Sequence, residues 1–261
     1  MTDSMTTIAG GSVQLIDMIF PGDTNHHGTL FGGVALAHMD KVAFLAAARH
    51  GRAPFVTASC ERIDFTAPAR LGELSEATGR IVRVGNSSVD VEVELVAEEL
   101  ISGDRRLCTR GLFTLVAIKG PDTRLPLPPI DAVVATPADG ALHMVDIVFP
   151  SQTNHYGTLY GGDALKMLGR AAFIAATRHA RAIMVMAASD RIDFTTPIRE
   201  GDMTECIARV RMTGRSSVSI QVELRAENLL TGRRAQAASA TFTMVAVDAD
   251  GRPLPHHAAL V

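Results

Sequence analysis

The chain has 261 residues, of which 47% are apolar, and this length suits one large domain or two small ones with real cores. Its formal net charge of −3 shows no basic field, which argues against a nucleic-acid-binding surface. No apolar run of about 18 or more residues is free of charge, so we expect no membrane span.

The N-terminal segment and the cysteines indicate the compartment. Residues 1–13 have neither a basic stretch nor an apolar core, so we expect no signal peptide. Cys60, Cys108 and Cys206 are scattered and form no CxxC pair. Such cysteines suit a reducing environment and give neither a disulfide framework nor a zinc site, so we expect a cytoplasmic protein.

Two copies of one sequence follow each other in the chain. Seven of nine residues are identical between Asn25–Gly33 and Asn154–Gly162, an offset of 129 residues. The same offset aligns Ile63–Phe65 with Ile192–Phe194 without a gap. A period this long indicates a duplicated domain, because solenoid units span about 20–50 residues.

The repeat predicts the domain organisation. We expect a first domain at residues 1–119 and a second at 141–248. The connector at 120–140 is rich in proline, as an extended linker would be, and residues 249–261 form a similar C-terminal tail.

Each repeat predicts the same elements in chain order. In the first repeat a strand at Val13–Ile19 precedes a long helix at Gly33–His50. Apolar and polar residues alternate from Val89 to Leu95, which is typical of a half-buried antiparallel strand, and Leu112–Ile118 predicts a central strand. The second repeat predicts equivalent elements, among them Leu142–Val148, Gly162–His179 and Thr241–Val247.

These elements predict an α+β fold in which each repeat is a β-α-β-β-β-β unit. The helix is apolar almost all round, which implies burial on most of its surface, and a curved antiparallel sheet around it would achieve this. The open edge of that sheet then needs a partner. The other repeat is the obvious one, so we expect an intramolecular pseudo-dimer.

Asp40 is the one ionisable group on its helical face, among residues such as Leu36 and Phe44. A carboxylate there should find hydrogen bonds, either as a structural cap for a nearby loop or as a functional group. The second repeat carries Gly169 at the equivalent position. The fold therefore does not require the carboxylate, which favours function.

The loop before each helix allows two interpretations. Asn25 and Asn154 suit a turn or a helix N-cap, and the glycines suit tight turns. Alternatively, a Gly-Gly pair at a helix start leaves backbone N–H groups open to hold a phosphate or a developing oxyanion. The paired glycines are Gly32-Gly33 and Gly161-Gly162.

Two further polar clusters each allow more than one interpretation. His26, His27 and His155 invite a metal-site interpretation, but adjacent histidines do not easily face one ion and no carboxylate stands at helical ligand spacing, so we expect no metal. Turn chemistry accounts for the serines that follow Gly85 and Gly214. Phosphate binding is the alternative, with Arg215 in one turn where the other has Asn86.

Together these residues resemble the acyl-CoA thioesterases of the hotdog fold, in the branch with tandem domains. The family pattern is Asn-x-x-Gly-x-x-x-Gly-Gly with an Asp seven residues later, then Arg-x-Asp-Phe, a Gly-Arg-x-Ser turn and a Phe-Thr-x-Val-Ala strand. The matching residues are Asn25, Gly28, Gly32, Gly33, Asp40, Arg62, Asp64, Phe65, Arg191, Asp193, Phe194, Gly214, Arg215, Ser217 and Phe242–Ala246.

The resemblance implies hydrolysis of acyl-CoA to a fatty acid and CoA, with the asparagine and glycines of one hotdog unit facing the aspartate of the other. One site would then be catalytic, with Asp40 as general base or as nucleophile through an anhydride. The site opposite would lack a base. The catalytic site pairs Asp40 with Asn154, Gly161 and Gly162, and the degenerate site pairs Gly169 with Asn25, Gly32 and Gly33.

The same resemblance implies residues that bind CoA and an assembly. We expect CoA contacts from a Thr-x-Ser strand after the helix and from the two turns, with Ala187 in the place of Thr57 in the second repeat. The predicted contacts are Thr57, Ser59, Asn86, Ser87, Ser88, Ser189, Arg215, Ser216 and Ser217. CoA is part of the substrate, so no separate cofactor is expected. Related tandem proteins imply a homo-oligomer, a trimer of tandem chains.

Two other functions remain open at this point, because a fold does not fix chemistry. An enoyl-CoA hydratase of the same fold has a signature similar to Gly-Asp-x-Asn-Pro-x-His, which Gly22–Gly28 approaches without the proline and with the histidine one place early. A non-catalytic acyl-CoA sensor is the other alternative, since one site lacks a base. Release of free thiol distinguishes an enzyme from a sensor.

Overall fold

The computed structural model describes residues 12–120, 123–129 and 140–255. The chain forms two compact units that follow the two repeats. Each unit also contains one short segment of the other repeat: Glu98–Arg105 belongs to unit 2, and Leu229–Thr231 belongs to unit 1. The units are described separately below.

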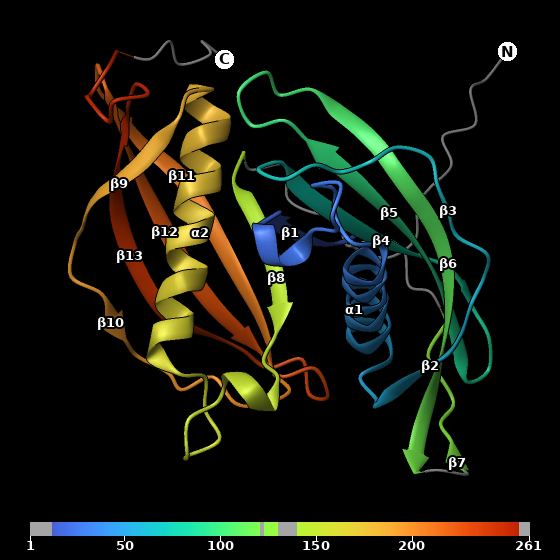
Figure 1. The fold of residues 1–261 in the computed structure, drawn as a ribbon. Coiled ribbons are helices and arrows are strands. Elements are labelled where there is room, and N and C mark those ends of the chain that lie inside the picture. The colour runs from blue at the N-terminus through green and yellow to red at the C-terminus, as the bar shows by residue number, and fades with distance from the viewer. Residues whose placement is uncertain (1–11, 121–122, 130–139, 256–261) are drawn as a thin grey trace, which may run out of the picture. The chain divides into compact units, whose positions relative to one another are not determined.

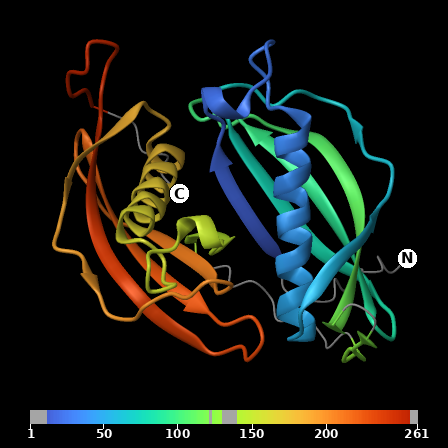
Figure 2. The same ribbon diagram turned by 60° about the horizontal axis from the view of Figure 1, so that its bottom comes forward.

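Unit 1 is a curved sheet around one helix (Figures 1 and 2). The sheet has the order β1-β4-β5-β6-β2, and β3 and β7 also pair with β6. Strands β1 and β2 pair antiparallel with β4 and β6. The elements are β1 (Val13–Met18), α1 (Gly32–Gly51), β2 (Phe55–Cys60), β3 (Asp64–Phe65), β4 (Leu74–Val84), β5 (Ser88–Glu98), β6 (Arg105–Gly120) and β7 (Thr123–Arg124).

Unit 2 repeats this architecture around a second helix. Its antiparallel sheet has the order β10-β13-β12-β11-β8, with β9 also paired to β13. In Figure 1 the sheet strands β11, β12 and β13 lie against α2. The elements are β8 (Leu142–Ile147), α2 (Gly161–Ala180), β9 (Met184–Ser189), β10 (Asp193–Phe194), β11 (Met203–Thr213), β12 (Ser217–Glu227) and β13 (Arg234–Ala246). A short 3-10 turn precedes each helix loop, at Pro21–Asp23 and Pro150–Gln152.

The predicted tandem hotdog fold is confirmed, and each predicted helix gains one residue at either end. The expected burial of the helix holds for one side only. Met39, Val42 and Leu45 are fully buried against the sheet, whereas Leu36 is 37% exposed. The side of α1 that carries Asp40 is therefore the open side.

The predicted linker and tail lie partly outside the described residues. Of the linker, residues 121–122 and 130–139 are not described. Within the rest, Thr123–Arg124 forms β7 against β6, and the N–H of Leu125 donates to the Ala117 carbonyl. At the C-terminal side, Pro253 forms an isolated bridge with Val247. The domain boundaries themselves stay a prediction.

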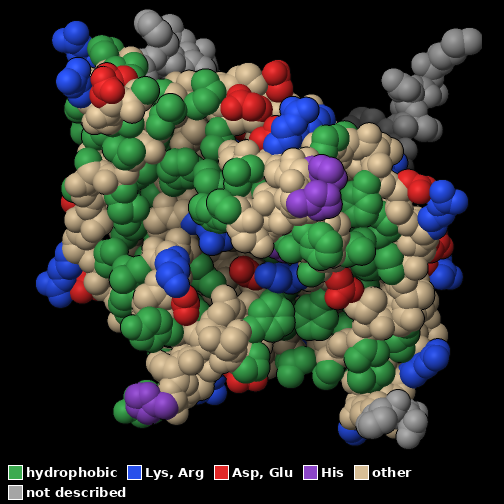
Figure 3. Space-filling view, in the orientation of Figure 1, with side chains coloured by type: hydrophobic (Ala, Val, Ile, Leu, Met, Phe, Trp, Pro, Cys, Tyr) green, Lys and Arg blue, Asp and Glu red, His purple; other side chains and the backbone are tan. Residues whose placement is uncertain are grey.

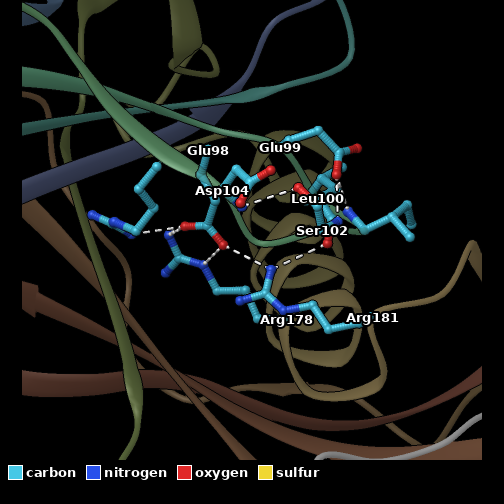
Figure 4. Close-up of polar contacts among 9 residues, drawn as sticks. Glu98, Glu99, Leu100, Ser102, Asp104, Arg178 and Arg181 are labelled. Atoms are coloured by element: carbon cyan, nitrogen blue, oxygen red, sulfur yellow. Dashed lines mark hydrogen bonds and ion pairs between the residues drawn. The ribbon is translucent and has the colours of Figure 1, made fainter.

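A buried carboxylate fixes the β5–β6 turn within unit 2 (Figure 4). Glu98 is 1% exposed and lies among three arginines. Arg178 and Arg181, at the C-terminal end of α2, approach its carboxylate oxygens at 2.6 Å and 3.0 Å, and Arg105 does so at 2.7 Å. A buried carboxylate needs such partners, because an unpaired charge in this position would be costly.

Arg181 shows how the helix end depends on this contact. Its backbone is left-handed, with φ of 47°, a conformation that favours glycine. Its side chain explains why arginine stands there, since Nη1 donates to Glu98 and to the Leu100 carbonyl. Arg52 repeats both features in unit 1, with φ of 48° and a bond to the Leu229 carbonyl.

We expect Glu98→Gln to lower the free energy of unfolding by about 3 kcal/mol at pH 7, because three arginines lose their carboxylate. Burial raises the pKa of Glu98, but the hydrogen bonds and charges of the arginines outweigh it and lower the pKa below its usual value of 4.5. The stabilisation is therefore complete above that value and is lost as the pH falls through the lowered pKa.

Urea unfolding between pH 3 and pH 8 measures both effects, with the exposed Glu200→Gln in the same unit as the control. A difference between wild type and Glu98→Gln that stays constant down to the lowest pH would contradict the ion-pair account.

Candidate active site

Asp40 stands halfway along α1, where its half-buried carboxylate meets strand β2. The Thr57 hydroxyl donates a hydrogen bond of 2.7 Å to Asp40 Oδ1. The strand is exposed from Val56 to Cys60, so this pair lies at an open surface of unit 1. One carboxylate oxygen is thus oriented by Thr57, while the other is available to a water or a substrate.

Unit 2 replaces this pair by two apolar residues. Gly169 takes the position of Asp40. The structure corrects the alignment of the strand: Thr57 pairs with Leu115 in unit 1, and the equivalent pair in unit 2 is Met186 with Met244. Met186 therefore stands in the place of Thr57, and the expectation of Ala187 there is wrong. By the same register Ser189 corresponds to Cys60.

The two asparagine loops have the same geometry. Asn154 Nδ2 donates to Thr158 Oγ1 at 3.0 Å, and its Oδ1 accepts the backbone N–H of Tyr156 at 2.9 Å. Asn25 makes the equivalent bonds to Thr29 and to His27 at 2.9 Å each. The side chain closes an Asx turn in both units, as the structural interpretation predicted. An amide Nδ2 carries two hydrogens, so one remains for a ligand.

Glycines shape the loops and the helix starts. Gly28 and Gly157 have φ of 70°, which L side chains rarely adopt. Each helix begins at the first glycine of its pair, so the N–H groups of Gly161 and Gly162 have no partner within the helix. A Cβ on Gly161 would meet no described atom within 4 Å, which leaves room for a ligand there.

A pocket lies beside each helix start. In unit 2 it measures about 300 Å³ and includes Gly161, Ala164 and Phe194 in its wall. In unit 1 it measures about 370 Å³ and includes the equivalent Gly32, Ala35 and Phe65, together with Asn25. These volumes fit a small apolar group, and the first glycine of each pair, Gly161 or Gly32, forms part of the pocket wall.

The predicted CoA-binding turns lie near the start of strands β2 and β9. The Ser87 carbonyl accepts the N–H of Ala117, which pairs with Phe55 at the beginning of β2. In unit 2 the Ser216 carbonyl accepts the N–H of Ala246, and Arg215 is exposed beside it. Ser189 is at the far end of β9, about 16 Å along the strand from its start at 3.3 Å per residue.

The remaining predicted features are at the surface. His26, His27 and His155 are exposed, and the described part of the chain contains no group of three or more metal-ligating side chains. Neither helix in the described ranges has the length and apolarity that a membrane crossing requires. On the face in Figure 3, blue basic and red acidic side chains of the described residues are interspersed.

Three residues of interest escaped the sequence analysis. Met186 was missed although a strict offset of 129 residues identifies it. Cys60 was counted only as a free thiol, although burial and then the negative charge of Asp40 raise its pKa. Glu98 was missed as well: the offset aligns it with Glu227, and the structure shows both glutamates to be buried.

Comparison with known proteins agrees with this geometry. The sequence profile of the Thioesterase superfamily matches residues 27–102 and 156–232, once in each repeat. The chain is 26% identical over 94% of its length to the cytosolic acyl coenzyme A thioester hydrolase of Rattus norvegicus, of which it covers 77%. It is 37% identical to an uncharacterized acyl-CoA thioester hydrolase of Bacillus subtilis, over 42% of this chain and 64% of that protein.

Among solved structures, an acyl-CoA hydrolase from Agrobacterium tumefaciens is 52% identical. Its alignment covers 95% of this chain and 99% of the other, with a TM-score of 0.85. The profile match in both repeats and this likeness over the whole chain lead to one conclusion. The chain belongs to the thioesterase superfamily and is a tandem hotdog thioesterase.

Proposed function

We propose that the protein hydrolyses acyl-CoA, adding water to the thioester and releasing a carboxylic acid and the free thiol of CoA. Relatives named as acyl-CoA hydrolases support this substrate class. The observation that carries the mechanism is the hydrogen bond between Thr57 and Asp40, which orients a carboxylate on an otherwise apolar helix face. Asp40 is then the general base that takes a proton from the attacking water.

The base and the helix-start amides of one repeat are too far apart to share a carbonyl group. Asp40 lies seven residues beyond Gly33 on α1, which is about 10 Å at 1.5 Å per residue. A general base and an oxyanion donor each act at about 3 Å from the reacting atoms. This distance argues against a site built within one repeat, and the family resemblance then pairs Asp40 with Asn154, Gly161 and Gly162 of the second repeat.

In this pairing the second repeat holds the thioester carbonyl. The N–H groups of Gly161 and Gly162 lie at the positive end of α2 and stabilise the negative charge that develops on the carbonyl oxygen. Asn154 orients the water or the carbonyl through its remaining Nδ2 hydrogen. Asp163 adds a carboxylate to the first turn of α2, and Lys166 bonds it at 3.0 Å, which offsets its charge.

Hydrolysis takes a proton from water and finally gives a proton to the CoA thiolate. Water attacks the carbonyl carbon as Asp40 accepts its proton, the carbon–sulfur bond breaks, and the CoA thiolate regains a proton. Direct attack by Asp40 through a mixed anhydride, which water then hydrolyses, is the alternative route. The apolar pocket beside Gly161 is the proposed place of the acyl group. The two serine turns and Ser59 are the proposed contacts for CoA.

The proposal extends to the cellular location and the oligomeric state of the protein. The rat relative is named as cytosolic, which supports the same location for this protein. The trimer of tandem chains stays a prediction. The relatives reported above are named as acyl-CoA hydrolases, which favours hydrolysis over the enoyl-CoA hydratase alternative. The sensor alternative is decided by the first experiment below.

Asp40→Asn should lower kcat/KM for acyl-CoA hydrolysis by about 10²–10⁴-fold, because the positioned base is lost. Thiol release from a panel of acyl-CoA substrates of increasing chain length measures it. Tight CoA binding without thiol release by the wild-type protein would favour a sensor and end the enzymatic proposal.

The two asparagines provide a matched pair of variants. Asn154→Ala and Asn25→Ala break the same bonds within the loop, so any structural damage is the same in both. We expect Asn154→Ala to cost at least about tenfold more in kcat, since only its loop faces a base in the proposed pairing. The reverse order would show that Asp40 serves the loop of its own repeat.

Thr57→Ala should lower kcat about 10- to 100-fold with little change in KM, because a hydrogen bond to a charged group contributes about 1.5–3 kcal/mol. Thr57→Ser keeps the hydroxyl and should retain most of the activity. The measurement also separates two roles for Thr57: a rise in KM with unchanged kcat would assign its hydroxyl to CoA rather than to Asp40.

Cys60 reports on Asp40 without any substrate. Burial raises the pKa of this thiol, and the negative charges of Asp40 and Glu61 raise it further. Burial also raises the pKa of Cys108, and it raises the pKa of Cys206 to about 12. Because the thiolate is the reactive form, the two buried thiols should be inert in the folded protein.

We therefore expect Asp40→Asn to speed the alkylation of Cys60 by iodoacetamide at pH 8, since one of the two charges that disfavour the thiolate is removed. Peptide mass spectrometry follows each cysteine, with Cys108 and Cys206 as internal controls. Glu61→Gln should have the smaller effect, in keeping with its lesser contribution. An unchanged Cys60 rate in Asp40→Asn would place the carboxylate away from the thiol.

A further inference from the structure

The pockets beside the two helix starts can be compared residue by residue. Each residue in the wall of the unit 2 pocket has its counterpart, 129 positions earlier, in the wall of the unit 1 pocket. All but two of these pairs are identical. The exceptions are Thr196 and Ile198 of unit 2, which stand where unit 1 has Ala67 and Ala69. The smaller pocket, of about 300 Å³ against about 370 Å³, is therefore the one with the larger side chains in its wall.

The backbone of this wall is held in the same way in both units. The N–H of Leu159 donates to the Ile198 carbonyl at 2.8 Å, and the equivalent bond from Leu30 to Ala69 has the same length. Ile198 and Ala69 are both buried, at 5% and 4% exposure. A common frame thus fixes the two positions, and the size of the side chain is the difference between them.

The unit 1 pocket reaches deeper into its core than the unit 2 pocket does. Its wall includes Leu95 and Cys108, which are 1% and 2% exposed. The counterparts in unit 2, Leu224 and Ala237, are not part of the described wall there. They do not obstruct the pocket themselves, because the leucine is unchanged and alanine is smaller than cysteine. The larger side chains at positions 196 and 198 account for the lost depth.

Resting on the proposed function, in which the unit 2 pocket takes the acyl group, we propose that Ile198, assisted by Thr196, sets the longest acyl chain that the enzyme accepts. The carbonyl lies at Gly161, which is part of the same wall, and the chain extends from there until it meets the isoleucine. A pocket of about 300 Å³ is at the small end of ligand-binding pockets, so the substrate class is acyl-CoA with a short chain. All of these residues belong to unit 2.

Thiol release from a series of straight-chain acyl-CoA substrates tests this assignment. Isoleucine is about three carbon atoms larger than alanine, and one methylene group in an apolar pocket changes discrimination about 10–200-fold. The readout is the ratio of kcat/KM for the first chain length that the wild type rejects to kcat/KM for its preferred one. We expect Ile198→Ala to raise this ratio by at least about tenfold. Thr196→Ala should raise it by less.

Loss of stability cannot produce this result. Truncating a buried isoleucine destabilises the fold, but a ratio of two substrates measured on one preparation does not depend on the fraction of folded enzyme. Ile198→Val removes a single methyl group at a smaller cost in stability. It should raise the ratio in the same direction as Ile198→Ala.

Unit 1 offers the matched control. Ala69→Ile places the larger side chain in the equivalent wall, and the ratio should stay as in the wild type. A ratio that Ile198→Ala and Ile198→Val both leave unchanged overturns the inference. A ratio that responds to Ala69→Ile alone does so as well, because the acyl chain would then lie in the pocket of unit 1.

Binding without turnover separates this inference from the proposed function. S-alkyl-CoA thioethers have no carbonyl group and cannot be hydrolysed, and calorimetric titration gives their dissociation constants. In Ile198→Ala each methylene group that the pocket newly accepts should tighten binding about fourfold. Unchanged thioether affinities, or thiol release with an unchanged chain-length profile, contradict only the inference. A wild type that releases no thiol contradicts the proposed function.

Discussion

The hydrogen bond from Thr57 to Asp40 is the interaction on which the proposed chemistry depends. A carboxylate on an apolar helix face is costly unless its oxygens are satisfied, and Thr57 satisfies one of them at 2.7 Å. The open β2 strand supplies that hydroxyl and leaves the second oxygen accessible. Helix and strand together therefore keep the carboxylate oriented and within reach of a ligand.

The duplication acts as an internal control for this interpretation. Features that both copies keep are those the fold needs, such as the Asx turns, the left-handed arginines at the helix ends and the buried Glu98 and Glu227. Asp40 and Thr57 are absent from the second copy, although its helix and strand have the same lengths as those of the first, 20 and 6 residues. Their joint absence supports the proposal that the pair serves a ligand rather than stability.

Much of the fold could be predicted from the sequence, because the alternation of apolar and polar residues marks the strands and the two repeats align without a gap. The helix bounds were within one residue at each end, and the alternation from Val89 to Leu95 correctly marked β5. The half-buried helix was not foreseen, since an apolar sequence does not say which side faces the sheet. The contact between Asp40 and Thr57 was not foreseen either, because it joins a helix and a strand 17 residues apart.

Glu98 illustrates a second limit. A charged residue before a turn is normally expected to be exposed to solvent. Only the contact between the β5–β6 turn and the end of α2 shows that Glu98 is buried. The misplaced counterpart of Thr57 had a different cause. Ala187 follows Met186 and lies in the irregularity of β9, where it has no partner in the register with β13, so a slip of one residue exchanged the chemistry of the site.

A structure of the wild-type protein with a ketone analogue of acyl-CoA, in which a methylene group separates the carbonyl carbon from sulfur and prevents hydrolysis, tests the central claim most directly. The measured quantity is the position of the analogue's carbonyl oxygen. The proposed pairing predicts that it lies within hydrogen-bond distance of the Gly161 and Gly162 amides, with the Asp40 carboxylate beside the carbonyl carbon. A carbonyl beside Asp40 that is bound instead by the amides of Gly32 and Gly33, or by neither pair, would contradict the account.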